Sequence, residues 1–264
     1  MQFLSMNMFS NSKYKQLYGL IGYPLGHSFS QDYFNEKFAA ERIDARYINF
    51  EIPTIEQVRT IVTENRNLAG FNVTIPYKEQ IFSYLDEVDD EARAIGAVNV
   101  VKVERGADGA VRLVGYNSDY SAFGDSIAPM IKSNVHQAAL VLGTGGASKA
   151  VAHALRRMGI EVVKVSRTKS GDGIITYDDL TPEVMAEHKI VVNATPVGMY
   201  PRVDACPPIP YETLTRQHIC YDLLYNPDET LFMRRAAAQG ATVKNGLEML
   251  LLQAFMSWKI WRTY

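Results

Sequence analysis

A glycine-rich turn between a short apolar run and a helical segment constrains the fold of this chain more than any other stretch. The apolar run 140–142 leads directly into Gly143-Thr144-Gly145-Gly146-Ala147-Ser148, after which the sequence is typical of a helix. A strand, a tight turn and a helix in this order aim backbone N–H groups and the positive end of a helix dipole at one point. Such a point suits a phosphate or pyrophosphate, so the sequence predicts a nucleotide site here.

The glycine pattern alone is a weak signal. Gly143-x-Gly145-x-x-Ser148 lacks the third glycine of G-x-G-x-x-G, and similar turns occur in sheets that bind no ligand. Its context favours a dinucleotide, because short apolar strands alternate with helices over residues 138–222. This alternation is typical of a parallel sheet with right-handed crossovers, which binds ligands beyond the carboxyl ends of its strands.

Hydrophobic periodicity predicts further elements on both sides of the turn. One predicted strand starts at residue 17, and the others cover 45–52, 70–75, 111–116, 138–142, 161–166, 189–193 and 218–222. A hairpin is predicted over 106–109. One predicted helix follows Ser28, and the others cover 55–64, 86–94, 120–127, 149–158, 181–188, 230–239 and 247–261. We therefore expect an α/β protein.

The residues after the strand 161–166 indicate which nucleotide binds. An NAD site places Asp or Glu there to accept a hydrogen bond from the ribose 2′-hydroxyl, whereas this chain has Ser166-Arg167-Thr168-Lys169. A guanidinium and hydroxyl groups would bind the 2′-phosphate that a carboxylate would repel. The sequence therefore predicts NADP as cofactor, and two solvated cations on a surface loop are the alternative.

Composition excludes several other classes. A chain of 264 residues makes one or two domains, and a net charge of −2 gives no electrostatic motive for binding nucleic acid or an anionic membrane. Cys206 and Cys220 do not form a C-x-x-C pair, so neither a disulfide framework nor a zinc site is expected, and we expect no metal. Residues 1–12 lack the features of a signal peptide and are expected to be a disordered lead-in to a cytoplasmic protein.

Polar residues in the first half of the chain have structural explanations that compete with ligand binding. Ser28 with Gln31 matches a capping box, so helix capping competes with ligand contact there. Lys78 follows a strand and is, by itself, typical of a solvated surface residue. Asp119 precedes a predicted helix, where an N-cap or Asx-turn role is the alternative.

The order of the polar motifs makes the chain resemble the shikimate dehydrogenase family. Before the glycine turn the matching motifs are Ser28-Phe-Ser30, Asn72-Val-Thr-Ile-Pro-Tyr-Lys78, Gly96-Ala-Val-Asn99 and Asn117-Ser-Asp119. After it they are Asn193-Ala-Thr-Pro-Val-Gly-Met199, Asp222-Leu-Leu-Tyr225-Asn-Pro, and Asn245-Gly-Leu-Glu-Met-Leu with Gln253. Each motif is common by itself, and the combination, which covers about residues 17–261, is specific.

The resemblance implies two domains with the active site in a cleft. Residues 13–115 and 246–264 would form an α/β substrate-binding domain, and residues 116–245 a Rossmann-like NADP-binding domain with a parallel sheet. The implied activity is the reduction of 3-dehydroshikimate to shikimate with NADPH, a step of aromatic amino acid biosynthesis. The implied partners are small molecules, with no nucleic acid or membrane, in a monomer or homodimer.

The resemblance also implies the roles of individual residues. Lys78 and Asp119 match the catalytic pair. The matches to substrate-binding residues are Ser28, Ser30, Thr74, Asn99, Tyr225 and Gln253. The matches to cofactor-binding residues are Gly143, Thr144, Gly145, Gly146, Ala147, Ser166, Arg167, Thr168, Leu223 and Gly246.

The catalytic pair also makes chemical sense without the family. Reducing a ketone by hydride leaves a developing alkoxide, which needs a positive neighbour and a proton, and a lysine can supply both. An aspartate within hydrogen-bond reach would fix the ammonium group and help to relay protons in the reverse direction.

Some residues depart from the family pattern and leave alternatives open. Thr144 stands where the family usually has alanine, Ser166 where it usually has asparagine, and Gly171 near a frequent second arginine. Lys169 would compensate for the missing arginine. The alternatives are a quinate/shikimate dehydrogenase that uses NAD, and a non-catalytic ligand-sensing relative, which would lack the lysine or the aspartate.

Overall fold

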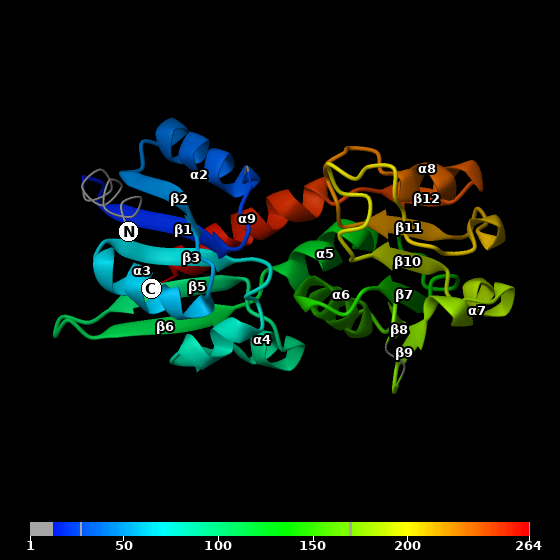
Figure 1. Cartoon of the computed structure of the whole chain (residues 1–264), viewed down its shortest axis with the longest axis horizontal. Coiled ribbons are helices and arrows are strands. Elements are labelled where there is room, and N and C mark those ends of the chain that lie inside the picture. Colours follow the sequence, from blue (N-terminus) through cyan, green and yellow to red (C-terminus); the bar gives the residue numbers. More distant parts are fainter. Residues whose placement is uncertain (1–12, 27, 169–170, 264) are drawn as a thin grey trace. The chain divides into compact units, whose positions relative to one another are not determined.

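The computed structural model describes residues 13–26, 28–168 and 171–263 (Figure 1). The expected lead-in over 1–12 and the side chain of Lys169 lie outside these residues. The described part of the chain divides into two compact units, one made of residues 13–118 with 254–263 and the other of residues 119–253. The start of the last helix lies in the second unit, where Glu248 accepts a hydrogen bond from Ser126 (2.9 Å).

The first unit is built on a six-stranded mixed sheet in the order β2-β1-β3-β5-β6-β4. Its strands are β1 (Gln16–Gly22), β2 (Ala45–Glu51), β3 (Leu68–Val73), β4 (Glu87–Val88), β5 (Val100–Arg105) and β6 (Val111–Tyr116). Strand β1 runs parallel to β2 and β3, whereas β5 is antiparallel to β3 and β6. The predicted hairpin between β5 and β6 is confirmed, with Gly109 in the left-handed region at φ +83°.

Helices cover both faces of this sheet. They are α2 (Phe29–Ala40), η1 (Ile55–Gln57), α3 (Val58–Glu64), η2 (Gln80–Tyr84), α4 (Asp90–Ile95) and the last part of α9 (Leu247–Arg262). Because side chains alternate along a strand, Leu17 and Ile21 of β1 pack with α3 and α4, and Tyr18 packs with α2 and α9. An aromatic cluster that includes Phe34 and Trp261 fills the face under α2 and α9.

The second unit is built on a six-stranded sheet in the order β12-β11-β10-β7-β8-β9, with every pair parallel. Its strands are β7 (Ala138–Leu142), β8 (Glu161–Ser166), β9 (Ile174–Thr176), β10 (Ile190–Asn193), β11 (Ile219–Asp222) and β12 (Thr242–Lys244). Counted within this unit the order is 3-2-1-4-5-6, which is that of dinucleotide-binding doubly wound sheets. The predicted parallel sheet is confirmed.

The connections of the second unit are helices on both faces of its sheet (Figure 1). They are α5 (Asp119–Ile127), η3 (Ala128–Met130), α6 (Gly146–Arg157), η4 (Tyr177–Asp179), α7 (Pro182–Glu187), η5 (Tyr211–Thr213) and α8 (Leu231–Ala238). Residues 139–142 of β7 are fully buried, as expected for a parallel strand covered on both sides. Among the described residues, no helix is both long and apolar enough to cross a membrane.

Candidate functional site

Four strand ends meet at one edge of the first sheet. The register pairs Ile21 near the end of β1 with Val73 at the end of β3, and pairs Val100 at the start of β5 with Tyr116 at the end of β6. We call this edge, which carries residues 28–30, 74–78, 97–99 and 116–118, the polar edge. The predicted site residues that the sheet topology places there are Ser28, Ser30, Thr74, Lys78 and Asn99.

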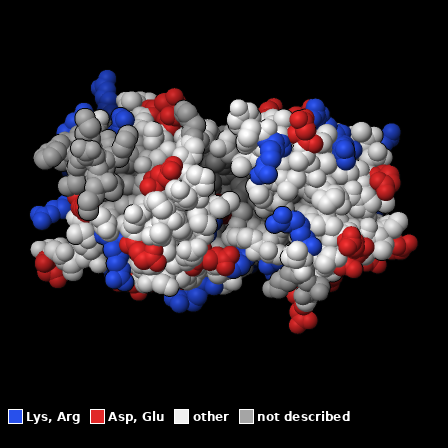
Figure 2. Space-filling model, in the orientation of Figure 1, with Lys and Arg blue, Asp and Glu red and all other residues white. Residues whose placement is uncertain are grey.

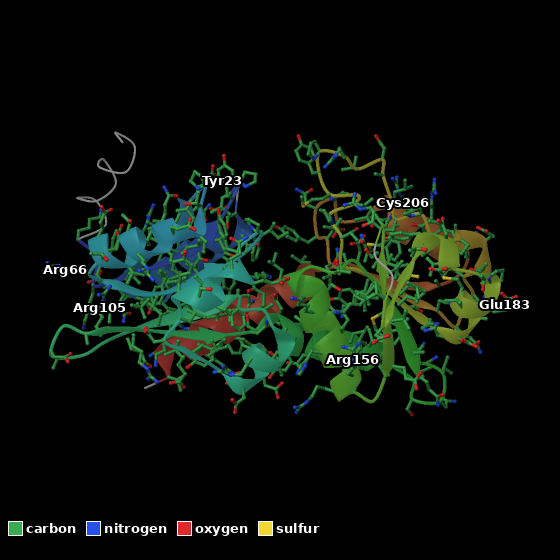
Figure 3. The ribbon with its side chains drawn as sticks, turned by 60° about the horizontal axis from the view of Figure 1, so that its bottom comes forward. Tyr23, Arg66, Arg105, Arg156, Glu183 and Cys206 are labelled. Atoms are coloured by element: carbon green, nitrogen blue, oxygen red, sulfur yellow. The ribbon has the colours of Figure 1, made fainter. Side chains whose placement is uncertain are left out.

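Backbone hydrogen bonds fix the Thr74 to Lys78 segment of the polar edge. The N–H of Thr74 donates to the carbonyl of Ile21 (2.9 Å), and the carbonyl of Lys78 accepts from Val98 (2.8 Å). Tyr23, labelled in Figure 3, donates from its N–H to the carbonyl of Ile75 (3.1 Å). Both ends of the segment are thereby held, and the side chain of Lys78 is half-buried.

The Asn99 segment is joined to the end of β6 by side chains that are almost fully buried. The Oδ1 of Asn99 accepts from the N–H of Ser118 (2.7 Å), and its Nδ2 donates to the Oγ of Ser118 (3.0 Å). Asn117 donates to the carbonyl of Ala97 (2.8 Å). Asp119 follows directly and is 5% exposed. Helix α5 begins at Asp119 itself, so Asp119 is not the N-cap residue.

The capping-box interpretation of Ser28 and Gln31 is wrong. Ser28 occupies the N-cap position of α2, but its side chain makes no capping hydrogen bond. The Oε1 of Gln31 accepts instead from the N–H of Asn49 (3.0 Å), and Asn35 bonds both backbone groups of Tyr47. Strand β2 lies at the sheet edge, so its unpaired backbone groups take up these side chains of α2.

The glycine turn of the second unit lies where the strand order reverses, between β7 and β10. Gly143 has φ +108°, and its N–H donates to the carbonyl of Val165 (2.8 Å). A Cβ added to Gly143 would lie 3.2 Å from both the carbonyl oxygen of Ala194 and the Cγ2 of Thr195. The turn is therefore fitted closely against the loop that follows β10.

The start of α6 provides room for an anion. Gly145 is the N-cap residue and Gly146 begins the helix, and no atom lies within 4 Å of a Cβ built on Gly145. Ser148, at the position of the missing third glycine, is buried and donates from its Oγ to the carbonyl of Gly143 (2.5 Å). The serine therefore closes the turn, and the helix N-terminus with its open approach fits a pyrophosphate group.

The ends of β8 and β11 complete this edge of the second sheet. Arg167 and Thr168 are exposed directly after β8. The N–H of Leu223, after β11, donates to the carbonyl of Asn193 (3.0 Å). A Cβ on Gly246 would overlap the carbonyl of Leu223, so only glycine fits there. Two predicted cofactor residues, Leu223 and Gly246, are thus in contact.

A buried polar network whose members have no role predicted from the sequence supports the same edge. Asp222 accepts hydrogen bonds from Thr230 (2.7 Å), from Asn193 (3.0 Å) and from the N–H of Leu224 (3.1 Å). The Oδ1 of Asn193 accepts in turn from the N–H and hydroxyl of Thr195 (3.1 and 2.6 Å). Burial raises the pKa of Asp222 to about 6, against the effect of these bonds. The apolar strands β10 and β11 each end in a polar residue, Asn193 and Asp222, and this sequence signal could have revealed the network.

Tyr225 and Gln253 belong to the second unit. Tyr225 lies on the loop after β11 and is 39% exposed, and Gln253 lies on α9, where its Nε2 donates to the carbonyl of Leu250 (3.0 Å). Their contact with a substrate stays a prediction.

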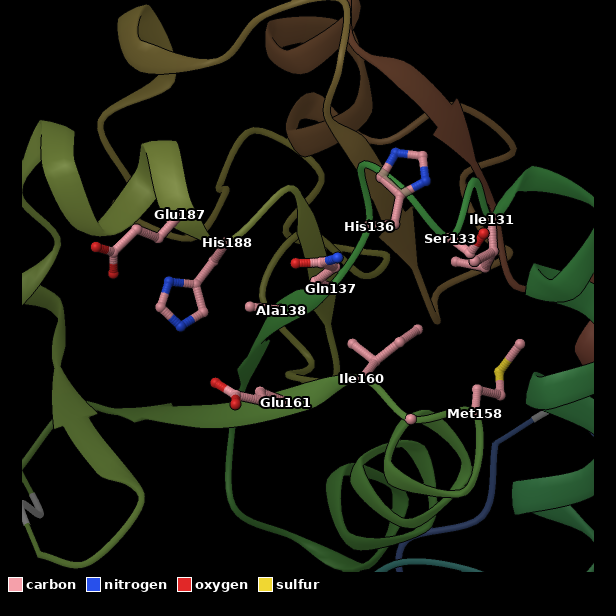
Figure 4. A pocket seen from close by; sticks show the side chains of 11 residues that line it. Ile131, Ser133, His136, Gln137, Ala138, Met158, Ile160, Glu161, Glu187 and His188 are labelled. Carbon is pink, nitrogen blue, oxygen red and sulfur yellow. The ribbon is translucent and has the colours of Figure 1, made fainter.

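A hollow of about 610 Å³ lies at the opposite edge of the second sheet, near the amino ends of β7, β8 and β10 (Figure 4). Both ring nitrogens of His136 are engaged, Nδ1 by the N–H of Lys132 (2.8 Å) and Nε2 by the carbonyl of Gln217 (3.0 Å). The Nδ1 of His188 bonds the carbonyl of Val184 (2.8 Å). These histidines tie backbone segments together. No group of three His, Cys, Asp or Glu side chains within 13–26, 28–168 and 171–263 could hold a metal ion.

Acidic and basic side chains are mixed on the face that Figure 2 shows, without a large patch of one sign.

Comparison with known proteins gives consistent matches along the chain. Residues 20–101 match the family model described as the shikimate dehydrogenase substrate binding domain. A protein of Desulforamulus reducens named shikimate dehydrogenase (NADP(+)) is 35% identical over 93% of this chain and 89% of its own length.

Solved structures that are similar to this chain point to the same family. A shikimate 5-dehydrogenase of Thermus thermophilus, in complex with NADP(H) and shikimate, is 33% identical, with a TM-score of 0.80, over 94% of this chain and 93% of that one. A shikimate 5-dehydrogenase of Listeria monocytogenes, in complex with shikimate and NAD, is 28% identical, with a TM-score of 0.80, over 94% and 91% of the two chains.

Proposed function

The chain belongs to the shikimate dehydrogenase family, and from this premise we propose that it reduces 3-dehydroshikimate to shikimate with NADPH, using Lys78 and Asp119 as its catalytic pair. Its activity is that of an NADP-dependent oxidoreductase of the shikimate pathway. The observation that carries the assignment of residues is the polar edge, where separate strand ends present Thr74, Lys78 and Asn99 together.

NADPH supplies the hydride when it is bound. The groups that would hold it are the open N-terminus of α6 for the pyrophosphate, and the backbone at Leu223 and Gly246. Arg167 and Thr168 would take the 2′-phosphate, because both are exposed at the end of β8 and no carboxylate precedes them there. Ser166, Thr144 and Ala147 would line the same edge.

Lys78 provides the proton that the reduced carbonyl oxygen needs. Its ammonium group also stabilises the negative charge that develops on this oxygen, which lowers the barrier most in a site that excludes water. Asp119 would orient the ammonium group and accept from a substrate hydroxyl. The bonds of Asn99 to Ser118 support this role, since they fix the residue directly before Asp119.

Substrate recognition is proposed to rest on hydroxyl and amide groups. Ser28, Ser30, Thr74 and Asn99 at the polar edge, with Tyr225 and Gln253, would bind the carboxylate and hydroxyls of shikimate. In domain terms, the first unit would bind substrate and the second NADP.

The alternatives are not favoured. The relatives are named as NADP-dependent shikimate dehydrogenases, which disfavours an NAD-dependent quinate enzyme. A ligand-sensing relative is disfavoured because Lys78 and Asp119 are both present. We also propose a monomer or homodimer in the cytoplasm: each unit closes its core within one chain, and both cysteines are free thiols.

The test is a steady-state assay with purified protein. We expect oxidation of NADPH that depends on 3-dehydroshikimate, a clear preference for NADPH over NADH, and little oxidation of quinate in reverse. Equal use of quinate and shikimate with NAD would favour the quinate enzyme instead. No turnover of either substrate would favour the sensing relative.

A further inference from the structure

Tyr47 is a buried tyrosine in the middle of β2, within the first unit. It is 0% exposed, and its hydroxyl donates to the Oδ1 of Asn72 (2.9 Å). Its ring stacks on Phe34, with centroids 4.8 Å apart and planes at 12°. The ring is therefore fixed by packing, and the hydroxyl is aimed across the sheet at β3.

The orientation of the Asn72 amide follows from its other partners. Its Nδ2 donates to the carbonyl of Asn99 (3.2 Å) and to the Oγ of Ser257 (2.9 Å). A carbonyl oxygen can only accept, so the amide nitrogen must face Asn99 and the amide oxygen must face Tyr47. The single proton of the Tyr47 hydroxyl is thereby committed to Asn72.

The second partner of the Tyr47 hydroxyl is Ser30, near the start of α2. Because the phenol proton goes to Asn72, the phenol oxygen can only accept from Ser30. This contact links Ser30, which is half-buried, to the buried Tyr47. Burial raises the pKa of Tyr47 well above its ordinary value, so the phenol keeps its proton at every working pH.

We propose that Tyr47 and Asn72 are positioning residues for the substrate. They join Ser30 on α2 to the backbone of Asn99 before β5 through one buried line of hydrogen bonds, and this line fixes two substrate contacts relative to each other. The inference rests on the proposed function in one respect, namely that Ser30 and Asn99 contact shikimate.

The conservative variant Tyr47→Phe tests the inference, because it removes the hydroxyl and keeps the stacked ring. We expect the KM for shikimate to rise about 2- to 10-fold, the change that one hydrogen bond of typical net strength is worth. The KM for NADP and kcat should stay within about twofold of wild type. Calorimetric titration of shikimate should give the same rise in Kd without any turnover.

Tyr18→Phe is the matched control. Tyr18 belongs to the same aromatic cluster and is 1% exposed, but its hydroxyl bonds Gln16 (3.3 Å) and not the line through Asn72. It should leave the KM for shikimate unchanged. An equal rise in both variants would mean that the KM responds to the packing of the cluster, and would overturn the inference.

A double-mutant cycle with Ser30→Ala separates positioning from a general structural effect. If Tyr47 acts through Ser30, the substitution Tyr47→Phe should raise the KM for shikimate less in the Ser30→Ala variant than in the wild-type protein. Fully additive effects, or an unchanged KM in a folded Tyr47→Phe, would overturn the inference.

Ser257→Ala covers the case in which Tyr47→Phe does not fold. It removes one partner of Asn72 and should raise the KM for shikimate in the same direction by a smaller factor, and an unchanged KM would then overturn the inference. A wild-type protein that neither binds nor oxidises shikimate would instead refute the proposed function. The two failures are therefore distinguishable.

Discussion

The side-chain amide of Asn99 holds Ser118 at two points, accepting from its N–H at 2.7 Å and donating to its Oγ at 3.0 Å. Both residues are at most 3% exposed. This pair therefore fixes the backbone directly before Asp119. Asn99, which is predicted to bind substrate, thus also helps to position Asp119, the predicted acid partner of Lys78.

Asn99→Ala should consequently affect both stability and turnover. The buried N–H of Ser118 would lose its acceptor, which costs about 1–3 kcal/mol of unfolding free energy. The shift of Asp119 should lower kcat by about 10-fold or more. Urea unfolding and steady-state kinetics measure the two effects. Ser118→Ala keeps the bond from the backbone N–H and should reduce both stability and kcat less than Asn99→Ala does. Smaller losses in Asn99→Ala than in Ser118→Ala would contradict this explanation.

Two glycines of the turn should respond differently to alanine. Gly143→Ala forces a side chain into φ +108° and against Ala194 and Thr195, so it should lower the unfolding free energy by about 1–3 kcal/mol. Gly145→Ala meets no atom within 4 Å and should leave stability unchanged. It should nevertheless raise the Kd for NADPH by about 10-fold, because its Cβ would stand where the pyrophosphate approaches. Fluorescence titration of NADPH measures this. A Gly145→Ala variant that binds NADPH normally would place the cofactor elsewhere.

Arg167→Ala should reduce the discrimination between the two nicotinamide cofactors. Loss of a charge-assisted bond to the 2′-phosphate should raise the KM for NADPH about 10-fold or more and leave the KM for NADH nearly unchanged. Arg156→Ala is the control, because Arg156 lies in the last turn of α6 and donates to the carbonyl of Val162 (3.4 Å) near the start of β8, at the other end of that strand from Arg167. Equal changes for the two cofactors in Arg167→Ala would argue against a 2′-phosphate contact.

Asp222 makes stability depend on pH. Its pKa is raised from 3.8 to about 6, chiefly by burial, so between these values the folded state keeps a proton that the unfolded state releases. The unfolding free energy should therefore fall as the pH rises from about 4 to about 6, by on the order of 3 kcal/mol. Above about pH 6 the contribution of Asp222 to the unfolding free energy should no longer change with pH.

Asp222→Asn isolates this contribution. Its amide oxygen can accept from Asn193 and Leu224, and its nitrogen can face the Thr230 hydroxyl, so the fold should persist. Relative to wild type, the variant should gain stability as the pH rises from about 4 to about 6. Urea unfolding at several pH values tests this, and a difference that does not change with pH would contradict the raised pKa.

The sequence was most informative where a pattern extends over many residues. Alternating strands and helices predicted the parallel sheet, and the motif order predicted the family. Strands β9 and β12 were not predicted, because each has three residues and gives almost no periodic signal. The hairpin at Gly109 was predicted because glycine separates two clear strands.

Side-chain partners were the least predictable part. Gln31 fits a capping box by spacing, yet it binds Asn49, because the unpaired edge of β2 lies beside α2 only in the folded protein. Likewise, Tyr47 and Asn72 are 25 residues apart, and nothing local shows that they share a hydrogen bond. Local spacing cannot reveal partners that tertiary packing brings together.

The kcat of Lys78→Ala with 3-dehydroshikimate and saturating NADPH tests the proposed chemistry most directly. The removal of a positioned proton donor should lower kcat by at least about 10²-fold, with a smaller change in the KM for substrate and an unchanged Kd for NADPH. A turnover close to that of wild type would contradict the assignment of Lys78 as the group that protonates the reduced carbonyl oxygen.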